Sequence, residues 1–339
     1  MDNSTSDDAA DELPPPIIPN NYPIVLRGFE SEEAAHKFAD ILRGLVLALS
    51  RYINLERLDG ITVAYDYLVA LADLDRGKPG LAPLVATSAD YGTGVAMTPA
   101  VLRDGVVKSH IVFNAAVVRE IENDLDKLDS KSLYLVAHEC AHVHDCMVRD
   151  KAFPNTILQK SFTGWLDSIR NEISSSCWEE YAACRLSAAF ASPEVSAAYE
   201  ELFLGAAMDA KRRANDAIKA YRIHGNVSQV VRAVVPEYGN TLKFAAYLLG
   251  TLHGAGKTLK DAPDATKFIA ASWCEDSIHS LDIELSTLFE TYGDWPDESV
   301  FDKIAEIGEQ MIADGGMTMN TISDGGMHVD LPFSFETMP

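Results

Sequence analysis

Two histidines four residues apart, with a glutamate directly after the first, could do chemistry in this sequence. The segment reads His138-Glu139-Cys140-Ala141-His142. On a helix, side chains four residues apart lie on one face, so both imidazoles can bind the same metal ion while Glu139 lies beside it. In zinc sites of this pattern the glutamate takes a proton from water and passes it to the leaving amine. The segment therefore predicts a zinc site for peptide-bond hydrolysis, with Glu139 as general base.

The residues around this motif indicate a helix that packs on a core. Apolar side chains recur there at helical spacing, and they are Leu133, Val136, Ala137, Cys140 and Ala141. His138, His142 and Asp145 follow a different stripe of the same helix. The alternative interpretation is that the histidines belong to an ordinary amphipathic helix without a metal.

A third metal ligand must come from another segment, because a catalytic zinc usually has three protein ligands. The segment Trp178–Phe190 is predicted to be a helix with a stripe of small residues, which would let a second helix approach closely. Glu180 lies at one end of this stripe. Glu179 is about 100° round the helix, where a solvated side chain is expected. We predict Glu180 as the third ligand, with Glu179 as the alternative.

These residues resemble the gluzincin zinc metallopeptidases, and within them the ImmA/IrrE-like family of cytoplasmic bacterial and phage peptidases. The second motif of that family, Glu-x-x-Ala-Asn-x-Phe-Ala followed by a proline, is similar to the register of Glu180, Ala183 and Pro193. Integral-membrane gluzincins have Glu-Tyr-x-Ala-Asp-Arg-Leu-x-Ala, which the segment 180–188 resembles. The run 111–114 is similar to the strand ending in asparagine that precedes the active-site helix.

The resemblance covers roughly residues 60 to 193. It implies an α+β fold with a zincin-like core, in which a small mixed sheet carries the two metal-binding helices, followed by a large C-terminal helical region. It also implies zinc bound by His138, His142 and Glu180, and a protein or peptide substrate such as a repressor. The activity would then be that of a zinc metalloendopeptidase with a regulatory role.

Two features depart from the family pattern. The family often has Asp or Asn four residues after the ligand glutamate, to orient a metal-bound histidine, whereas this chain has Cys184. Asp145 or His144 could take over that role. Glu180 also follows His142 by 38 residues, so the segment 149–175 is predicted to form an inserted loop and helix over the cleft.

The chain divides into four predicted parts. Residues 1–22 are acidic, rich in proline and short of large apolar side chains, which is typical of a disordered tail. Residues 23–193 form the predicted metallopeptidase core, and residues 194–313 form a helical domain. In the tail 314–339, the turn residues Asp324-Gly325-Gly326 favour a hairpin.

The expected elements follow the order that the resemblance requires. Ser31 is the predicted N-cap of a helix that continues to about Tyr52. Runs of β-forming residues then predict strands at 61–65, 84–87, 94–98 and 106–114. After Ser192-Pro193, the helical pattern predicts helices at 194–222, 226–235, 240–253, 277–291 and 298–313.

Two further sets of residues have candidate roles in the cleft. The run Gly94–Thr98 is short and has small side chains, so it is a candidate sheet edge that pairs with an extended substrate; the alternative is an interior strand. His224, His253 and Tyr221 are candidate donors to the transition state, although single residues of these types at helix ends are usually structural.

Composition limits the other function classes. A formal net charge of −23 opposes binding to nucleic acid. No apolar run reaches the ~18 residues of a membrane span, and the acidic N-terminus does not look like a secretory signal, so we expect a cytoplasmic protein. The five cysteines lack paired metal-ligand spacing and are expected to be reduced thiols, although Cys140 or Cys184 could bind the metal. The sequence gives no indication of the oligomeric state.

The prediction is therefore a cytoplasmic zinc metallopeptidase. Two alternatives stay open. One is a non-enzymatic protein in which zinc only stabilises the fold and the helical half binds a partner. Retention of Glu139 favours the enzyme, since a structural zinc site needs no base. The other is a toxin-like or defence-associated peptidase, which shares the chemistry and differs in its target.

Overall fold

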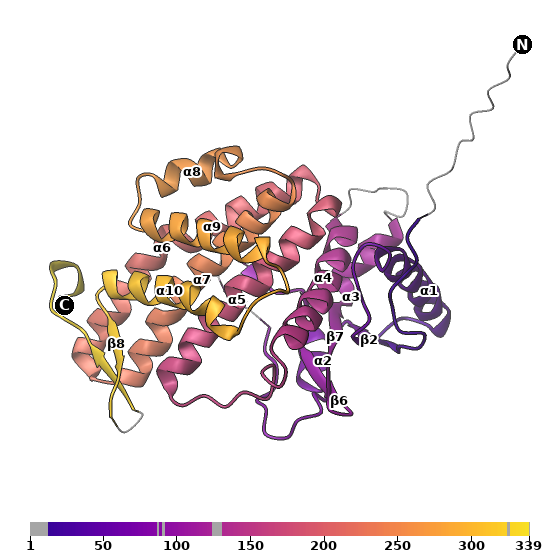
Figure 1. Ribbon diagram of the computed structural model, residues 1–339, viewed down its shortest axis with the longest axis horizontal. Coiled ribbons are helices and arrows are strands. Elements are labelled where there is room, and N and C mark those ends of the chain that lie inside the picture. Colours follow the sequence, from indigo (N-terminus) through magenta and orange to yellow (C-terminus); the bar gives the residue numbers. More distant parts are fainter. Residues whose placement is uncertain (1–12, 87, 90–91, 124–130, 324–325, 339) are drawn as a thin grey trace, which may run out of the picture.

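Figure 1 shows the computed structural model of the chain, which describes residues 13–86, 88–89, 92–123, 131–323 and 326–338. The fold is α+β, with a sheet-containing half and a helical half. Helices α4 (Lys131–Ala152) and α5 (Trp165–Ser187) lie side by side where the halves meet (Figure 1). These two helices carry the predicted metal ligands.

The sheet is small and mixed, as predicted. Its order is β1 (Ile24–Arg27), β2 (Leu58–Ala64), β7 (Val106–Asn114) and β5 (Ala96–Met97), and β6 (Ala100–Arg103) also pairs with β7. The first three strands are parallel, whereas β5 and β6 run antiparallel to β7. The apolar strand β7 is buried because α4 packs against it. The sheet thereby supports the helix that carries the histidine motif.

Several local predictions are confirmed. Helix α1 (Glu32–Leu49) begins after Ser31, whose Oγ accepts a hydrogen bond from the backbone N–H of Ala34 at 3.1 Å. The strand predicted at 106–114 has those bounds. The strand predicted at 94–98 is β5, shorter than expected, and it lies at the end of the sheet order.

One predicted strand is absent and several elements were not predicted. Residues 84–86 form no strand, and residue 87 lies outside the described residues. Val85 is 79% exposed, so the apolar run does not reflect burial. The elements that were not predicted include β1, β6, α2 (Tyr67–Ala72), α3 (Ala115–Val118), α8 (Pro263–Ile269) and the strand pair β3 (Ser88–Ala89) and β4 (Gly92–Thr93).

The helical half contains α6 (Pro193–His224), α7 (Val227–Gly254), α8 (Pro263–Ile269), α9 (Glu275–Glu290) and α10 (Asp302–Asp314). The prediction of two helices at 226–235 and 240–253 is wrong, because α7 continues through Pro236. An internal proline costs about 3 kcal/mol. Packing of α7 against α5, α6, α9 and α10 offsets that cost. Short 3₁₀ segments complete the fold at Arg119–Asn123, Ala188–Phe190, Leu259–Asp261, Glu298–Phe301 and Phe335–Thr337.

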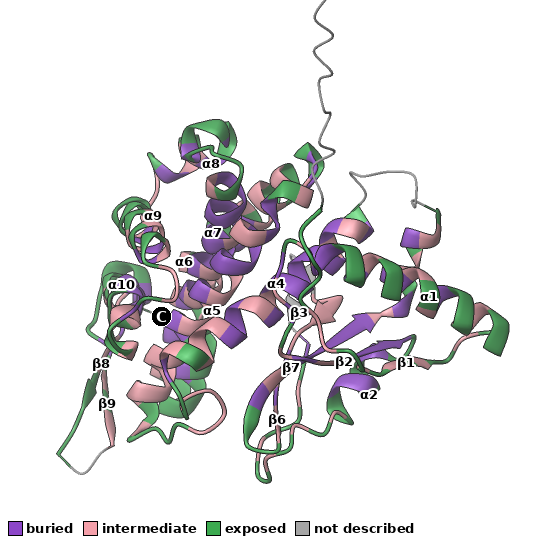
Figure 2. Cartoon of the chain, turned by 45° about the vertical axis from the view of Figure 1, so that its right-hand side comes forward, coloured by how far each residue is buried: buried purple, intermediate pink, exposed green. Residues whose placement is uncertain are grey.

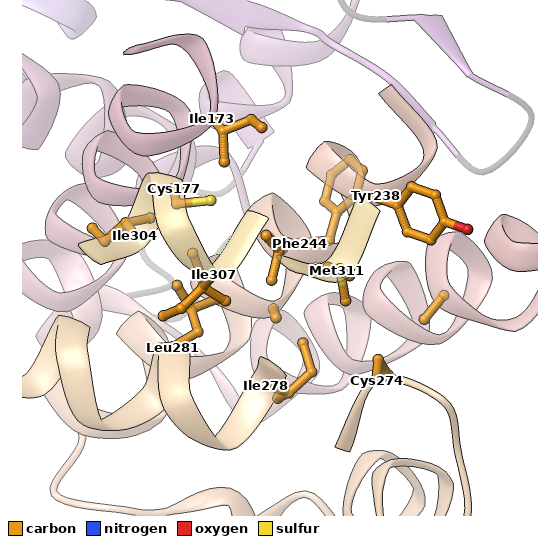
Figure 3. Packing of buried hydrophobic residues seen from close by; sticks show 14 of the residues in the cluster. Ile173, Cys177, Tyr238, Phe244, Cys274, Ile278, Leu281, Ile304, Ile307 and Met311 are labelled. Atoms are coloured by element: carbon orange, nitrogen blue, oxygen red, sulfur yellow. The ribbon is translucent and has the colours of Figure 1, made fainter. Parts of the chain in front are cut away.

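Two hydrophobic cores meet at the α4–α5 contact. The apolar face of α4, including Val136 and Cys140, packs in one core with α1 and the sheet. The buried face of α5, including Ile173 and Cys177, belongs to the core of the helical half, which Figure 3 shows together with Phe244 of α7. The core of the helical half therefore contains residues on both sides of the predicted boundary at residue 193.

The small-residue stripe of α5 lies between α4 and α7. On one side, Cys184 contacts His138 of α4. On the other side of α5, the backbone of α7 is so close that a Cβ added at Gly250 would lie 2.4 Å from the carbonyl oxygen of Tyr181. Only glycine fits that position. The stripe predicted from the sequence thus lies where α5 packs against both α4 and α7. Figure 2 shows these three helices next to one another, with many buried residues.

Two other predicted segments differ in the structure, whereas the antiparallel strand pairing predicted for the C-terminal tail is present. The segment 149–175 contains the end of α4, a loop and the first half of α5, so its helix is continuous with the one that carries Glu180 and is not a separate insertion. Residues 1–12 lie outside the described residues, and the backbone of Ile17 hydrogen-bonds to Ser50 and Leu55. In the C-terminal tail, β8 (Thr318–Thr321) and β9 (Met327–Asp330) pair antiparallel, and the turn residues Asp324 and Gly325 lie outside the described residues.

Candidate functional site

Three predicted metal ligands lie together between α4 and α5. The Nε2 atoms of His138 and His142 are 3.1 Å apart, and Oε2 of Glu180 lies 3.4 Å and 3.3 Å from them respectively. The three residues form a cluster that could hold a metal ion. All three ligand atoms therefore face one point, as the spacing of the motif predicts.

The surroundings of Glu180 favour a bound cation. Its Oε2 is buried and forms no hydrogen bond with any residue that the structure describes. A buried acceptor in that state costs about 1–3 kcal/mol or more, and a metal ion is the kind of partner that removes the cost. Burial would raise the pKa of Glu180, but the charges of Lys243 and His142 hold it well below its usual range. The carboxylate is thus ionised, as a metal ligand must be.

The Glu180 carboxylate also changes the pKa of His142. Burial disfavours protonation of His142, but Glu180 outweighs burial and raises the pKa of His142 to about 9 in the metal-free protein. A positive charge is therefore favoured between the two helices. A metal ion would supply that charge while leaving both imidazoles neutral.

Cys184 lies where the resemblance would place an Asp or Asn that orients a histidine. Its Sγ lies 3.7 Å from Nδ1 of His138, and it accepts a hydrogen bond from the hydroxyl of Tyr134 at 3.6 Å. With the proton on Nδ1, the Nε2 lone pair of His138 is directed to the metal position. This contact would hold the His138 ring in one orientation, since the sulfur lies beside Nδ1 while Nε2 faces the other candidate ligands. Cys140 is buried in the core of the sheet half, and all five cysteines are free thiols.

The two residues considered as replacements for that role have other contacts. Asp145 is fully buried and accepts hydrogen bonds from Arg149, Trp178 and Tyr292 at 2.8, 3.1 and 3.1 Å. The Nδ1 atom of His144 accepts from the backbone N–H of Asn54 at 3.1 Å. Asp145 therefore links α4, α5 and the residues after α9, and neither residue orients a ligand through these bonds.

Glu179 does not point to the metal ligands. Its carboxylate is 39% exposed and pairs with Arg149 at 2.8 Å. The sequence argument that places Glu180, and not Glu179, on the inner face of the helix is confirmed by this geometry.

Glu139 is buried beside the ligands and has a partner that sequence reasoning did not identify. The hydroxyl of Thr98 donates to Oε2 of Glu139 at 2.6 Å. Thr98 directly follows β5, so this hydrogen bond joins the candidate base to the sheet edge. The sequence offered one signal for Thr98, its place at the end of the predicted edge strand. Its hydrogen bond to Glu139 depends on tertiary packing, which the sequence pattern does not reveal.

Two cavities open on either side of these residues. One of about 370 Å³ is lined by Glu139, the three ligands, residues of β5 and residues of α6 and α7. The other, of about 610 Å³, is bounded by the loop after α4 and the first half of α5. Met97, Thr98, His142, Glu179 and Glu180 line both, so the cleft passes along the metal ligands.

The helical half places two unpredicted residues next to the ligands. Nζ of Lys243 lies 3.5 Å from Oε1 of Glu180, and the ring of Tyr247 stacks on His138 with centroids 5.8 Å apart. Burial and the nearby Glu180 carboxylate raise the pKa of Tyr247 well above its ordinary value, so its hydroxyl keeps its proton. Both residues lie one turn apart on α7, and both line the smaller cavity.

The three donors considered from the sequence lie elsewhere. His253 interacts with Tyr181 and Asp282 at 2.8 and 3.0 Å, and His224 accepts from the backbone N–H of Asn226. The ring of Tyr221 packs against that of His224 at the end of α6. None of these three lines either cavity of the cleft. These contacts fit the structural role that residues of these types usually have at helix ends.

In the described ranges, none of the helices combines the length and the apolar composition that crossing a lipid bilayer requires. Comparisons of the chain with protein-family models, with curated proteins and with solved structures find no match. The geometry of the site is therefore the evidence on which a function can be argued.

Proposed function

We propose that the chain is a zinc-dependent endopeptidase that hydrolyses peptide bonds of a protein substrate. The observation that carries this proposal is the triangle formed by two imidazole nitrogens and one carboxylate oxygen, with edges of 3.1, 3.3 and 3.4 Å. Ligand atoms about 2.0–2.1 Å from a tetrahedral zinc are roughly 3.3 Å apart, so the triangle matches three corners of such a site. Three protein ligands leave the fourth position of a tetrahedral zinc for water or substrate.

The residues around this triangle suit hydrolysis. Zinc held there would act as a Lewis acid, which polarises a carbonyl group and makes water a better nucleophile. Glu139 lines the same cavity as the ligands and is not one of them, so its carboxylate can accept the proton of the attacking water and deliver it to the departing amine. The hydroxyl of Thr98 holds that carboxylate in one orientation. A site whose zinc only stabilised the fold would not need a base in an accessible cavity.

The edge strand β5 supports binding of an extended peptide. The carbonyl oxygens of Val95 and Pro99 accept hydrogen bonds from Asn114 and His110 at 2.9 and 3.0 Å, so alternate residues of this strand face β7. By that alternation, the N–H and C=O groups of Ala96 point away from β7. Within the described residues, β5 pairs with no strand other than β7. Ala96 also lines the smaller cavity, so its outward groups can pair with a substrate backbone.

Replacing Ala96 with proline is expected to abolish most substrate cleavage while leaving folding and metal content intact. Proline removes the outward N–H, which makes no ladder hydrogen bond with β7, and edge strands tolerate proline. The measurement compares cleavage, thermal stability and zinc content of Ala96→Pro with those of wild type. Unchanged cleavage, or general unfolding, would place the substrate-binding strand elsewhere.

Replacing Thr98 with valine is expected to reduce kcat/KM by about 10-fold, because the shape is kept while the hydrogen bond to Glu139 is lost. Zinc content should not change, since Thr98 is not in the ligand cluster. Thr98→Ser is the matched control and should restore most of the activity. If Thr98→Val and Thr98→Ser are equally active, the hydroxyl has no part in positioning Glu139.

The direct test of the proposed function uses purified full-length protein and a mixture of unfolded proteins. We expect cleavage by the zinc-loaded protein, its loss on treatment with a chelator, and its return with added zinc. Cleavage that persists in the chelated, zinc-free protein would contradict a metal-dependent mechanism.

A further inference from the structure

The two cavities of the cleft differ in chemical character. Apart from the catalytic residues, Thr98, Glu179 and Lys243, the smaller cavity is lined by apolar and aromatic side chains, and they include Val95, Leu135, Tyr199, Leu202, Phe244 and Tyr247. Nζ of Lys243 is held by Glu180 at 3.5 Å. The larger cavity is lined by both signs of charge, and many of these charges are paired with each other, as in Lys160–Glu298 and Arg149–Glu179. Of the two cavities, the smaller one therefore offers the more apolar surface next to the ligands.

The walls of this apolar cavity are firmly placed. Leu202 and Tyr199 come from α6, and Phe244 and Tyr247 come one turn apart from α7. The rings of Tyr199 and Tyr247 pack with centroids 5.0 Å apart, and those of Phe244 and Tyr247 stack at 5.7 Å. Its volume of about 370 Å³ accommodates a large side chain.

The position of the two cavities along β5 fixes their order on a bound peptide. Gly94, Val95 and Ala96 line only the apolar cavity, whereas Pro99 and Ala100 line only the larger one. Antiparallel pairs are somewhat more stable per residue than parallel ones and outnumber them roughly two- to three-fold. A peptide antiparallel to β5 therefore has its amino-terminal part at the larger cavity and its carboxyl-terminal part at the apolar cavity.

We propose that the residue directly after the cut bond is large and apolar, such as leucine, isoleucine, methionine or phenylalanine, and that its side chain enters the cavity of Tyr199, Leu202, Phe244 and Tyr247. This assignment rests on the proposed peptidase function. The larger cavity then accepts mixed polar residues before the cut bond. Specificity thus comes from α6 and α7, which lie beyond the segment that carries the family resemblance.

The test uses a degenerate library of short synthetic peptides in two measurements. In the first, zinc-loaded wild-type protein digests the library and mass spectrometry locates the cuts. We expect large apolar residues after the cut to be favoured at least about 10-fold over glycine and aspartate, since even one methylene in an apolar pocket changes discrimination by about 10-fold or more. In the second, immobilised zinc-loaded Glu139→Gln retains peptides from the same library without any need for cleavage.

A pair of variants on one helix tests the cavity itself. Leu202→Lys introduces a charge into the apolar wall, and Met208→Lys makes the same kind of change on α6 at a side chain that is 67% exposed and lines neither cavity. We expect Leu202→Lys to remove the apolar preference in both measurements, and Met208→Lys to keep it. Zinc content and circular dichroism check the fold, and Leu202→Gln serves as a milder change if Leu202→Lys unfolds.

The outcomes separate this inference from the function on which it rests. Cuts without an apolar preference after the bond, a preference before the bond, or a preference unchanged in Leu202→Lys would each overturn the inference while leaving a peptidase. If the zinc-loaded protein cuts nothing, the proposed function fails. The peptides retained on Glu139→Gln then show whether the cavity binds apolar side chains. Retention of apolar peptides that Leu202→Lys abolishes supports the apolar site, and indiscriminate retention overturns it.

Discussion

Replacement of Glu139 with glutamine is expected to lower peptide-bond cleavage by about 10²- to 10⁴-fold, the usual contribution of a general acid–base group. Glutamine keeps the shape and can still accept the hydrogen bond from Thr98. It cannot take the proton of the attacking water. Zinc content should remain at about one ion per chain, because Glu139 is not in the ligand cluster.

The same variant separates the enzyme from a protein in which zinc only stabilises the fold. Kinetics with a cleaved peptide, metal analysis and thermal unfolding are compared between Glu139→Gln and wild type. A variant with full biological effect and unchanged zinc content would reject the peptidase and favour a non-enzymatic partner-binding protein. Loss of zinc together with activity would instead show that Glu139 is a ligand.

Alanine at His138, His142 or Glu180 is expected to remove nearly all bound zinc. Each supplies one of three ligand atoms within 3.4 Å of one another, so two ligands would remain. Loss of the metal removes the Lewis acid, and cleavage should fall to background. Metal analysis of the purified variants and competition with a chelator measure this.

The chain offers matched controls for both residue types. His144 is on the same helix, and its imidazole binds the backbone of Asn54, so His144→Ala should retain zinc. Glu179 pairs with Arg149 at the cleft, so Glu179→Ala should also retain it. Equal zinc affinity in Glu180→Ala and Glu179→Ala would refute the register of α5 at the site.

The grouping of the three candidate ligands could be predicted from the sequence because helical spacing determines their geometry. The residues at positions 138 and 142 must share a face of α4 whatever surrounds that helix. The small residues after Glu180 identified the face of α5 that packs closely against other helices, and this put Glu180 and not Glu179 at the site. Both inferences needed only local periodicity.

The rest of the site comes from tertiary contacts that local periodicity does not encode. Thr98 reaches Glu139 because β5 is added to the sheet beside α4. Lys243 and Tyr247 reach the ligands because α7 packs on α5 through Gly250. In the sequence, Lys243 and Tyr247 lie within an ordinary helical pattern of apolar residues. His253 had the side chain more typical of a catalytic site, but it interacts with Tyr181 and Asp282.

The fold errors have similar causes. Pro236 predicts a helix end from local chemistry, but α7 is packed against several helices, and this burial outweighs the cost of the proline. The first half of α5 looked like an insertion because its apolar residues, such as Ile173, face a core formed by helices much later in the chain. That core joins residues of α5 to helices after residue 193, so it spans the boundary that the resemblance predicted.

The central claim, a zinc-dependent endopeptidase acting through Glu139, is tested most directly by comparing new protein termini in cells that express wild type with those in cells that express Glu139→Gln. Both proteins should be present at equal levels with equal zinc content. The account predicts that wild type generates new termini in one or a few proteins, with a large apolar residue after the cut bond, and that Glu139→Gln generates none of them. The same set of termini in both cells, or none in either, would contradict it.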